Sequence, residues 1–443
     1  MINRRQFLTL ASAASASLSM PIMATGSKNN AGSGQFPDDF IWGAASAGHQ
    51  VEGNNVNSDI WLLENVKPSL FKEPSGDACN SFELWETDLD LCKALGLSAY
   101  RFSIEWARIQ PEPGFYSQAM IDHYKRIIEG CHKRNLVPMV SFNHFASPQW
   151  FAARGGWTNP QAPQLFADFC QRAASDLADG IGYAVTFNEP NLLRLLKVIG
   201  VPPIFWTMTG KMLDAAAQAV NSETFCALNS ARAEDLDTMN ALLIEGHKLA
   251  RAAIKGERST LNVGFTLAML DEVSDGTRGG DAKRDEMRDY NYGDWLALND
   301  TDFIGVQNYE RVVTTKEGKL PVPEDAQRNH AGRWVEPTSL ANCVEYTYHT
   351  TQKPIIVTEH GIGTENDAQR EWFITESLRH LQHTIEQGVP VKGYVHWTLL
   401  DNFEWVSGYS EHFGLHTVDR TTFERKQKPS AKAYSEIVKR NRI

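Results

Sequence analysis

Eight short runs of β-branched and aromatic residues, separated by longer amphipathic stretches, restrict the fold of this chain more than any other feature. The runs span 40–45, 99–104, 137–144, 184–190, 263–268, 302–309, 355–360 and 393–400. Some, such as Pro354 to Thr358, are almost continuously apolar, as strands buried on both faces require. Eight alternations of strand and helix predict a single (β/α)8 TIM barrel with elaborated βα loops, for which 443 residues are sufficient.

Helical periodicity fills most of the intervals between these runs. Apolar residues recur with helical spacing in five stretches: 82–95, 120–134, 165–177, 236–254 and 372–387. We expect these stretches to form the outer ring of the barrel. The segments 191–235 and 271–298 show no clear period, and we expect both to be elaborated loops.

The first 35 residues are predicted to be an export signal peptide and a linker, and residues 36–443 are predicted to form the barrel domain. Arg4-Arg5-Gln6-Phe7-Leu8 precedes a weakly apolar stretch rich in Ala and Ser, which a polar linker follows up to Gln35. This pattern resembles a twin-arginine export signal; an ordinary basic N-terminus is the alternative. The resemblance implies recognition by the twin-arginine export machinery and a periplasmic or secreted protein.

Charge and cysteine usage exclude several classes of function. A net charge of −11 disfavours binding to nucleic acid or to an anionic membrane, because both partners are negative. No apolar run reaches the roughly 20 residues that a membrane-spanning helix needs. The six cysteines form no C-x-x-C pair, so we expect free, mostly buried thiols rather than a zinc or redox site. A neutral small-molecule ligand, with no metal or cofactor, fits this composition.

Polar, aromatic or acidic residues end six of the eight predicted strands. They are Arg101, Asn143-His144, Asn188-Glu189, Asn308-Tyr309, Thr358-Glu359 and Trp397. Because barrel enzymes carry their chemistry at the carboxyl ends of the strands, we expect these side chains to converge on one pocket. Glycosidic cleavage needs one carboxylic acid to protonate the leaving oxygen and one carboxylate to meet the oxocarbenium-like centre. Glu189 and Glu359 on opposed strands provide such a pair, unless they only form ion pairs at the rim.

Motifs spread from Phe40 to Val438 resemble glycoside hydrolase family 1, the β-glucosidase and β-galactosidase family. The matching blocks are Phe40–Gly43, His49–Gly53, Tyr100–Trp106, Asn188–Pro190 and the block from Leu400 through Trp405, Tyr409 and Gly414 to Asp419. The resemblance implies a retaining β-glycosidase with a covalent glycosyl-enzyme, in the first place a β-glucosidase, with galactosidase or fucosidase side activity left open.

The resemblance also implies individual roles. Glu189 is the expected acid/base and Glu359 the expected nucleophile. Further residues complete the expected site: Arg101 and Tyr309 beside the nucleophile, Asn188 at the sugar 2-hydroxyl, Gln50, His144, Glu404 and Trp405 at the other hydroxyls, and Trp397 as the stacking floor. A carboxylate at Glu404 also argues against a phosphorylated sugar, since like charges repel.

Three departures from the family pattern leave the sugar preference open: Gln307 in the sixth strand, His360 after the nucleophile and Phe145 where many members have Trp. The span 198–208 is unusually apolar and follows the acid/base strand, so we expect an apolar aglycone rather than a second sugar. A helix and loop that only pack on the barrel would give the same pattern. A transglycosylase with the same mechanism and a non-catalytic sugar-binding member of the fold are the remaining alternatives.

Overall fold

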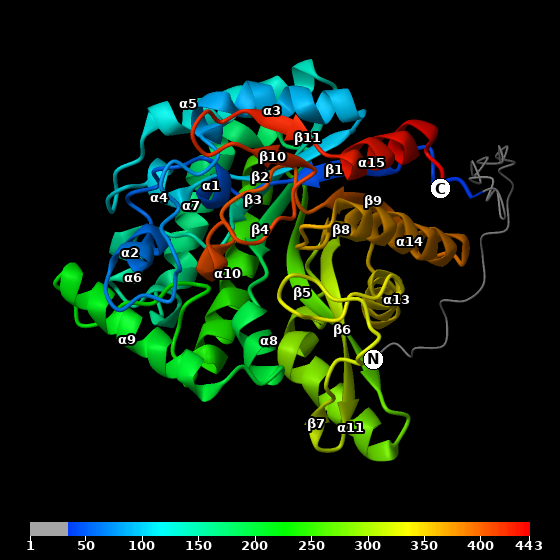
Figure 1. Cartoon of the computed structure of the whole chain (residues 1–443). Helices are drawn as coiled ribbons and strands as arrows, with labels where there is room; N and C mark the ends of the chain where they lie inside the picture. The colour runs from blue at the N-terminus through cyan, green and yellow to red at the C-terminus, as the bar shows by residue number, and fades with distance from the viewer. Residues whose placement is uncertain (1–33) are drawn as a thin grey trace, which may run out of the picture. The chain divides into compact units, whose positions relative to one another are not determined.

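The computed structural model describes residues 34–443, and the predicted export signal lies outside them. Eight parallel strands close into a barrel, which confirms the predicted fold (Figure 1). They are β1 (Ile41–Ala45), β2 (Ala99–Ser103), β3 (Val137–Asn143), β4 (Tyr183–Asn188), β5 (Asn262–Ser274), β6 (Ile304–Thr315), β8 (Ile355–His360) and β9 (Val391–His396). Each overlaps one of the eight predicted runs. Pairing of β5 with β6 and of β9 with β1 closes the ring.

Seven long helices surround the strands. They are α3 (Ser81–Leu95), α5 (Gln118–Lys133), α7 (Ala162–Leu177), α10 (Leu236–Glu257), α13 (Ser339–Thr351), α14 (Asp367–Glu386) and α15 (Pro429–Arg440). Five of them correspond to the predicted helical stretches, whereas α13 and α15 were not expected from periodicity. Inside the ring, Ala45, Met139, Val185, Ile356 and Val395 belong to one buried apolar cluster that fills the barrel below the strand ends.

Short helices and turns lie in the loops that connect the barrel strands with the outer helices. They are α1 (Gly48–Val51), α2 (Asp59–Asn65), α4 (Trp106–Ile109) and α6 (Gln149–Ala152), with 3₁₀ turns at Gly156–Thr158, Ala178–Gly180 and Trp405–Ser407. A small antiparallel pair, β10 (His416–Val418) and β11 (Arg425–Gln427), follows the last barrel strand.

The expectation that 191–235 is a loop is wrong, because it contains α8 (Leu192–Val198) and α9 (Pro203–Ala219). The face of α9 that carries Met212 and Leu213 is buried in a cluster with Ile60 and Leu63 of α2. Ile204, in the first turn of α9, is apolar but 62% exposed. Apolar residues on both its buried and its exposed sides hide the helical period of this segment.

The segment 271–298 is also structured. Strand β5 continues to Ser274 and is followed by α11 (Arg278–Arg288), a π-helical turn (Asp289–Gly293) and α12 (Asp294–Leu296). Strand β6 likewise passes its expected end at 309 and turns back as β7 (Gly318–Lys319). These additions pair β5 and β6 beyond the barrel, where Asp271 to Ser274 lie opposite Arg311 to Thr314. The polar residues in these strand extensions made them resemble loop.

All six cysteines are buried and free, as expected: Cys79, Cys92, Cys131, Cys170, Cys226 and Cys343. Within residues 34–443, no helix has the length and apolar character needed to cross a bilayer. The same residues contain no group of three or more His, Cys, Asp or Glu side chains placed to hold a metal ion.

Candidate active site

A cavity of about 390 Å³ opens at the carboxyl ends of the barrel strands and contains both glutamates. Eight of the predicted site residues line it: His144, Asn188, Glu189, Tyr309, Glu359, Trp397, Glu404 and Trp405. Gln50 and Arg101 are buried and contact members of this lining through hydrogen bonds. The structure therefore brings together all ten residues to which the family resemblance assigned roles.

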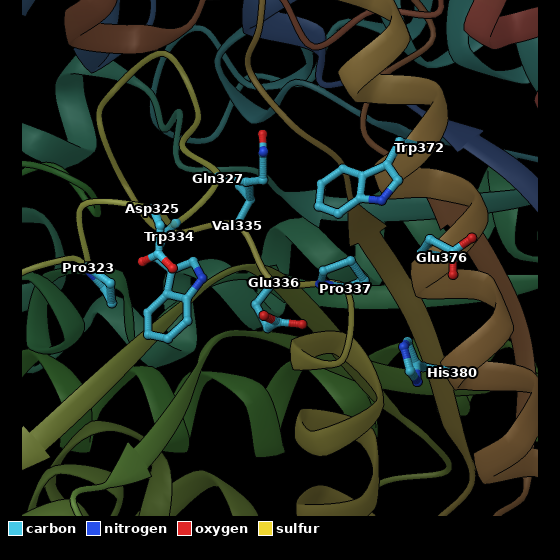
Figure 2. A pocket seen from close by; sticks show the side chains of 11 residues that line it. Pro323, Asp325, Gln327, Trp334, Val335, Glu336, Pro337, Trp372, Glu376 and His380 are labelled. Atoms are coloured by element: carbon cyan, nitrogen blue, oxygen red, sulfur yellow. The ribbon is translucent and has the colours of Figure 1, made fainter.

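A larger hollow of about 630 Å³ lies elsewhere, between α14 and the loop 323–337. Figure 2 shows the indoles of Trp334 and Trp372 at opposite ends of this hollow, with Glu336 between them. Neither Glu189 nor Glu359 lines it. Size therefore does not identify the candidate active site here, whereas the paired carboxyl groups do.

Glu359, in β8, is held at both carboxylate oxygens. The buried Arg101 donates to Oε1, and the Tyr309 hydroxyl donates to Oε2 at 2.6 Å. Burial raises the pKa of Glu359, and these two partners act against that rise. A guanidinium in direct contact compensates a carboxylate and fixes its orientation, as a positioned nucleophile requires.

Glu189 follows β4 directly and has a backbone φ of 45°, in the left-handed region. Its N–H donates to the carbonyl of Thr266 on β5 at 3.1 Å, which anchors this conformation. Phe145 and Trp405, also on the cavity, share this unusual backbone region, and such strain clusters at functional sites. Burial and the charge of Glu359 raise the pKa of Glu189 well above its ordinary value. The proton of the pair is therefore expected on Glu189 at neutral pH.

Asn188 has a fixed amide orientation. Its Oδ1 accepts hydrogen bonds from Arg101, from Gln307 Nε2 at 2.9 Å and from Thr266 Oγ1 at 3.2 Å. Three donors converge on this atom, so it must be the oxygen, and the amide nitrogen faces His144 Nε2 at 3.3 Å.

The orientation of Asn188 decides which nitrogen of His144 carries the proton. Because Nε2 accepts from the Asn188 amide, the proton of the neutral ring sits on Nδ1, for which none of the described residues is a hydrogen-bond partner. Burial and the charge of Arg101 lower the pKa of His144 well below its ordinary value, so the ring is neutral. His144 thus offers one N–H donor to a ligand.

Trp397, Glu404 and Gln50 complete this part of the cavity. Glu404 accepts from Trp397 Nε1 and from Gln50 Nε2, each at 3.3 Å, while Gln50 Oε1 is buried and has no hydrogen-bond partner within residues 34–443. Burial raises the pKa of Glu404 well above its ordinary value. The His144 ring stacks with Trp397 and with Trp405, at centroid distances of 5.6 and 6.1 Å. Unpaired donors and acceptors beside indole rings match the hydroxyl groups and apolar faces of a sugar.

Some strand-end residues do not reach the cavity, contrary to expectation. Asn308 bonds instead to Ser339 of α13 and to the carbonyl of Met269, and Asn143 bonds to the loop at Ala146 and Ser147. Alternation along a strand turns them away from the cavity. Thr266, which contacts Asn188 and Glu189, was not predicted as a site residue. Its position as a polar residue within the fifth apolar run could have indicated such a role.

The sequence comparison decides the family. The model of glycosyl hydrolase family 1 matches residues 32–226 and 283–443. The chain belongs to glycosyl hydrolase family 1. β-Glucosidase A of Thermotoga maritima is 27% identical over 456 aligned positions, which cover 92% of this chain and 98% of that protein. The cytosolic β-glucosidase of Homo sapiens is also 27% identical, over 92% of this chain and 98% of its own length.

Solved structures of similar chains agree with this assignment. A β-glucosidase designated 1317 has a TM-score of 0.87 and 37% identity, and the match covers 90% of this chain and 98% of that one. The β-glycosidase BGL167 has a TM-score of 0.86 and 41% identity, with 92% and 98% covered.

This family 1 glycoside hydrolase has a cavity with two contrasting halves. The inner half comprises the ten predicted site residues and Gln307. The outer half is mostly apolar and comprises Leu192, Leu195 and Leu196 of α8, Phe205 of α9, Ala268, Met269 and Leu270 of β5, and Asn229. Of the apolar span 198–208, only Phe205 lines the cavity; the neighbouring α8 and β5, which lie side by side, supply most of the wall (Figure 1).

Proposed function

We propose that the protein is a retaining β-glucosidase that releases unphosphorylated glucose from β-glucosides by double displacement. The observation that carries this proposal is the pairing of Glu359, held at both oxygens by Arg101 and Tyr309, with Glu189, whose pKa burial and Glu359 raise. The relatives described as β-glucosidases support glucose as the sugar.

In the first step, a carboxylate oxygen of Glu359 attacks the anomeric carbon while Glu189 gives its proton to the glycosidic oxygen. The bond between the anomeric carbon and that oxygen breaks, the aglycone leaves as an alcohol, and the sugar is bound to Glu359 as an ester. Glu359 is then neutral, so the charge that raised the pKa of Glu189 is gone. Glu189, now a carboxylate, takes a proton from water as the oxygen attacks the anomeric carbon, and the ester bond breaks.

The inner half supplies complementary groups for sugar hydroxyls. His144 Nδ1–H can donate to one hydroxyl, and Gln50 Oε1 can accept from another. None of the described residues that line the cavity is Lys or Arg, which supports an unphosphorylated sugar.

We further infer that the aglycone is apolar, such as a phenolic, terpenoid, steroidal or lipid group. The apolar wall formed by Leu192, Leu196 and Phe205 supports this choice, because a second sugar would leave its hydroxyls without partners there. The test compares kcat/KM for cellobiose with that for the β-glucoside of an apolar aliphatic alcohol, whose leaving group is similar in basicity to a sugar hydroxyl. Preference for the apolar glucoside is expected, and equal values would overturn the inference.

The catalytic roles are tested with Glu359→Ala. We expect turnover of 2,4-dinitrophenyl β-glucoside to fall by roughly 10⁶-fold, since the nucleophile is missing. Added azide should enter the space left by the carboxylate and restore part of the rate, giving the α-configured glucosyl azide. A fully active variant, or a rescued product of β configuration, would contradict the assignment.

We also propose that the chain is exported by the twin-arginine route, on the basis of Arg4-Arg5 before an apolar stretch. Replacing both residues with Lys should retain enzyme activity inside the cell and abolish it in the periplasmic or secreted fraction. Unchanged distribution would overturn the proposal.

A further inference from the structure

Asn229 belongs to the outer half, and none of the described residues provides a hydrogen-bond partner for its buried side-chain oxygen. It lies in a tight turn in which Ala227 and Ser230 exchange two backbone hydrogen bonds, at 3.0 and 3.3 Å. This ladder fixes the position of the turn. Asn229 is absent from the described residues with positive φ, so the backbone here does not require Asn.

Two other polar side chains border the apolar wall, and both have partners. Glu310 faces Arg333 at 3.7 Å, and Glu411 accepts a hydrogen bond from Ser407 Oγ at 2.7 Å. The amide of Asn229 differs, because a buried carbonyl without a hydrogen-bond partner destabilises a protein. Rotating the amide by 180° would only bury the nitrogen instead. A ligand group that hydrogen-bonds this atom would remove the penalty.

The position of Asn229 indicates which end of the aglycone it meets. Helix α8 begins three residues after Glu189 and spans seven residues, or about 10 Å. At its outer end, Lys197 donates to the carbonyl of Ala233, four residues beyond Asn229. The turn 227–230 is therefore near the end of α8 that is remote from Glu189. The two matched stretches of the family model end at 226 and resume at 283, so the family pattern does not account for Asn229.

We propose that Asn229 is a specificity-determining residue that hydrogen-bonds a hydroxyl group on an otherwise apolar aglycone, at the end remote from the glycosidic oxygen. The preferred substrates are then glucosides of rigid, hydroxylated polycyclic phenols or alcohols. This inference rests on the proposed β-glucosidase function and names its substrate class. The apolar wall binds the skeleton, and Asn229 distinguishes skeletons by one polar group.

The test uses 3-O-β-glucosides of a four-ring phenolic steroid that share one leaving oxygen. Two carry a remote hydroxyl, at position 16 or at position 17, and the third carries none. We expect wild-type kcat/KM for at least one hydroxylated substrate to exceed that for the deoxy substrate by ~10-fold, as one buried hydrogen bond predicts. Asn229→Leu should remove this preference, and Asn229→Asp, which keeps an acceptor, should retain part of it.

4-Nitrophenyl β-glucoside, which lacks a remote hydroxyl, is the control substrate. In Asn229→Leu, kcat/KM for the favoured hydroxylated glucoside should fall by ~10-fold relative to kcat/KM for this control substrate, and equal melting temperatures would exclude damage to the turn. If wild-type enzyme does not distinguish the three steroid glucosides, or if Asn229→Leu still does, the role of Asn229 is overturned. A wrong β-glucosidase proposal would give a different result, because the wild-type enzyme would then not cleave 4-nitrophenyl β-glucoside.

Discussion

The inner and outer halves of the cavity are built in different ways. Most inner residues lie at or just beyond the ends of barrel strands and hydrogen-bond one another, and Arg101 donates to both Glu359 and Asn188. Outer residues come from α8, α9, the turn 227–230 and β5, and contact one another chiefly through apolar surface.

This difference separates two properties of the enzyme. The inner half arranges charge around the bond that breaks, so a change there should affect substrates regardless of aglycone. The outer half removes apolar surface from water, so a change there should affect only substrates with a matching aglycone. Each prediction below tests that separation.

After the loss of the nucleophile, Glu189→Ala is expected to have the next largest effect, and this effect should depend on the leaving group. Without the acid, kcat/KM for cellobiose should fall by ~10³–10⁴-fold, whereas 2,4-dinitrophenyl β-glucoside, whose leaving group needs no proton, should lose far less in the glycosylation step. Pre-steady-state kinetics would measure this step as a burst of dinitrophenol. An equal loss for both substrates would show that Glu189 is not the acid.

The pH dependence should identify the same pair. The raised pKa of Glu189 predicts that kcat/KM of the wild type falls as pH rises through that pKa, because the acid form disappears. It should also fall as pH decreases and Glu359 becomes protonated. In Glu189→Ala, the profile for the dinitrophenyl substrate should show the acidic decline and no alkaline decline. Retention of the alkaline decline would assign it to another group.

Tyr309→Phe removes one hydrogen bond to Glu359 and should lower kcat by about 10²-fold. The factor should be similar for cellobiose and for an apolar aryl glucoside, because Tyr309 acts on the nucleophile. Its hydrogen bond lowers the pKa of Glu359, so the acidic decline should move to higher pH in the variant. A loss of kcat for only one of the two substrates would contradict the proposed division of roles between the inner and outer halves.

Much of the barrel was predictable because each strand is buried on both faces and reads as a short apolar run. The ends of the strands were harder to predict. Strands β5 and β6 continue beyond the barrel with polar residues such as Asp271 and Glu310. There the two strands pair with each other, and this pairing takes the place of burial inside the barrel. Helix α9 was hidden because exposed apolar residues such as Ile204 blur its period.

The inner half was predictable for a related reason. Its residues sit in short motifs whose members are neighbours in sequence, such as Asn188 and Glu189. The outer half combines α8, Asn229 and β5, which are far apart along the chain and meet only in the fold. Sequence located an apolar segment near 198–208, but only the structure shows that Phe205 alone of that span reaches the cavity.

Phe205→Ala is expected to have the smallest effect and to be the most selective. Phe205 lines the cavity, whereas its neighbour Ile204 is 62% exposed and does not. Loss of the ring should lower kcat/KM for an apolar aryl glucoside by ~10-fold, since one apolar contact is removed, and leave cellobiose nearly unchanged. Ile204→Ala, a truncation one residue away, should change neither value. Both variants shorten an apolar side chain in the first turn of α9, so a loss of kcat/KM in both would indicate damage to the helix. A loss of kcat/KM for the aryl glucoside only in Phe205→Ala would place the aglycone against the Phe205 ring.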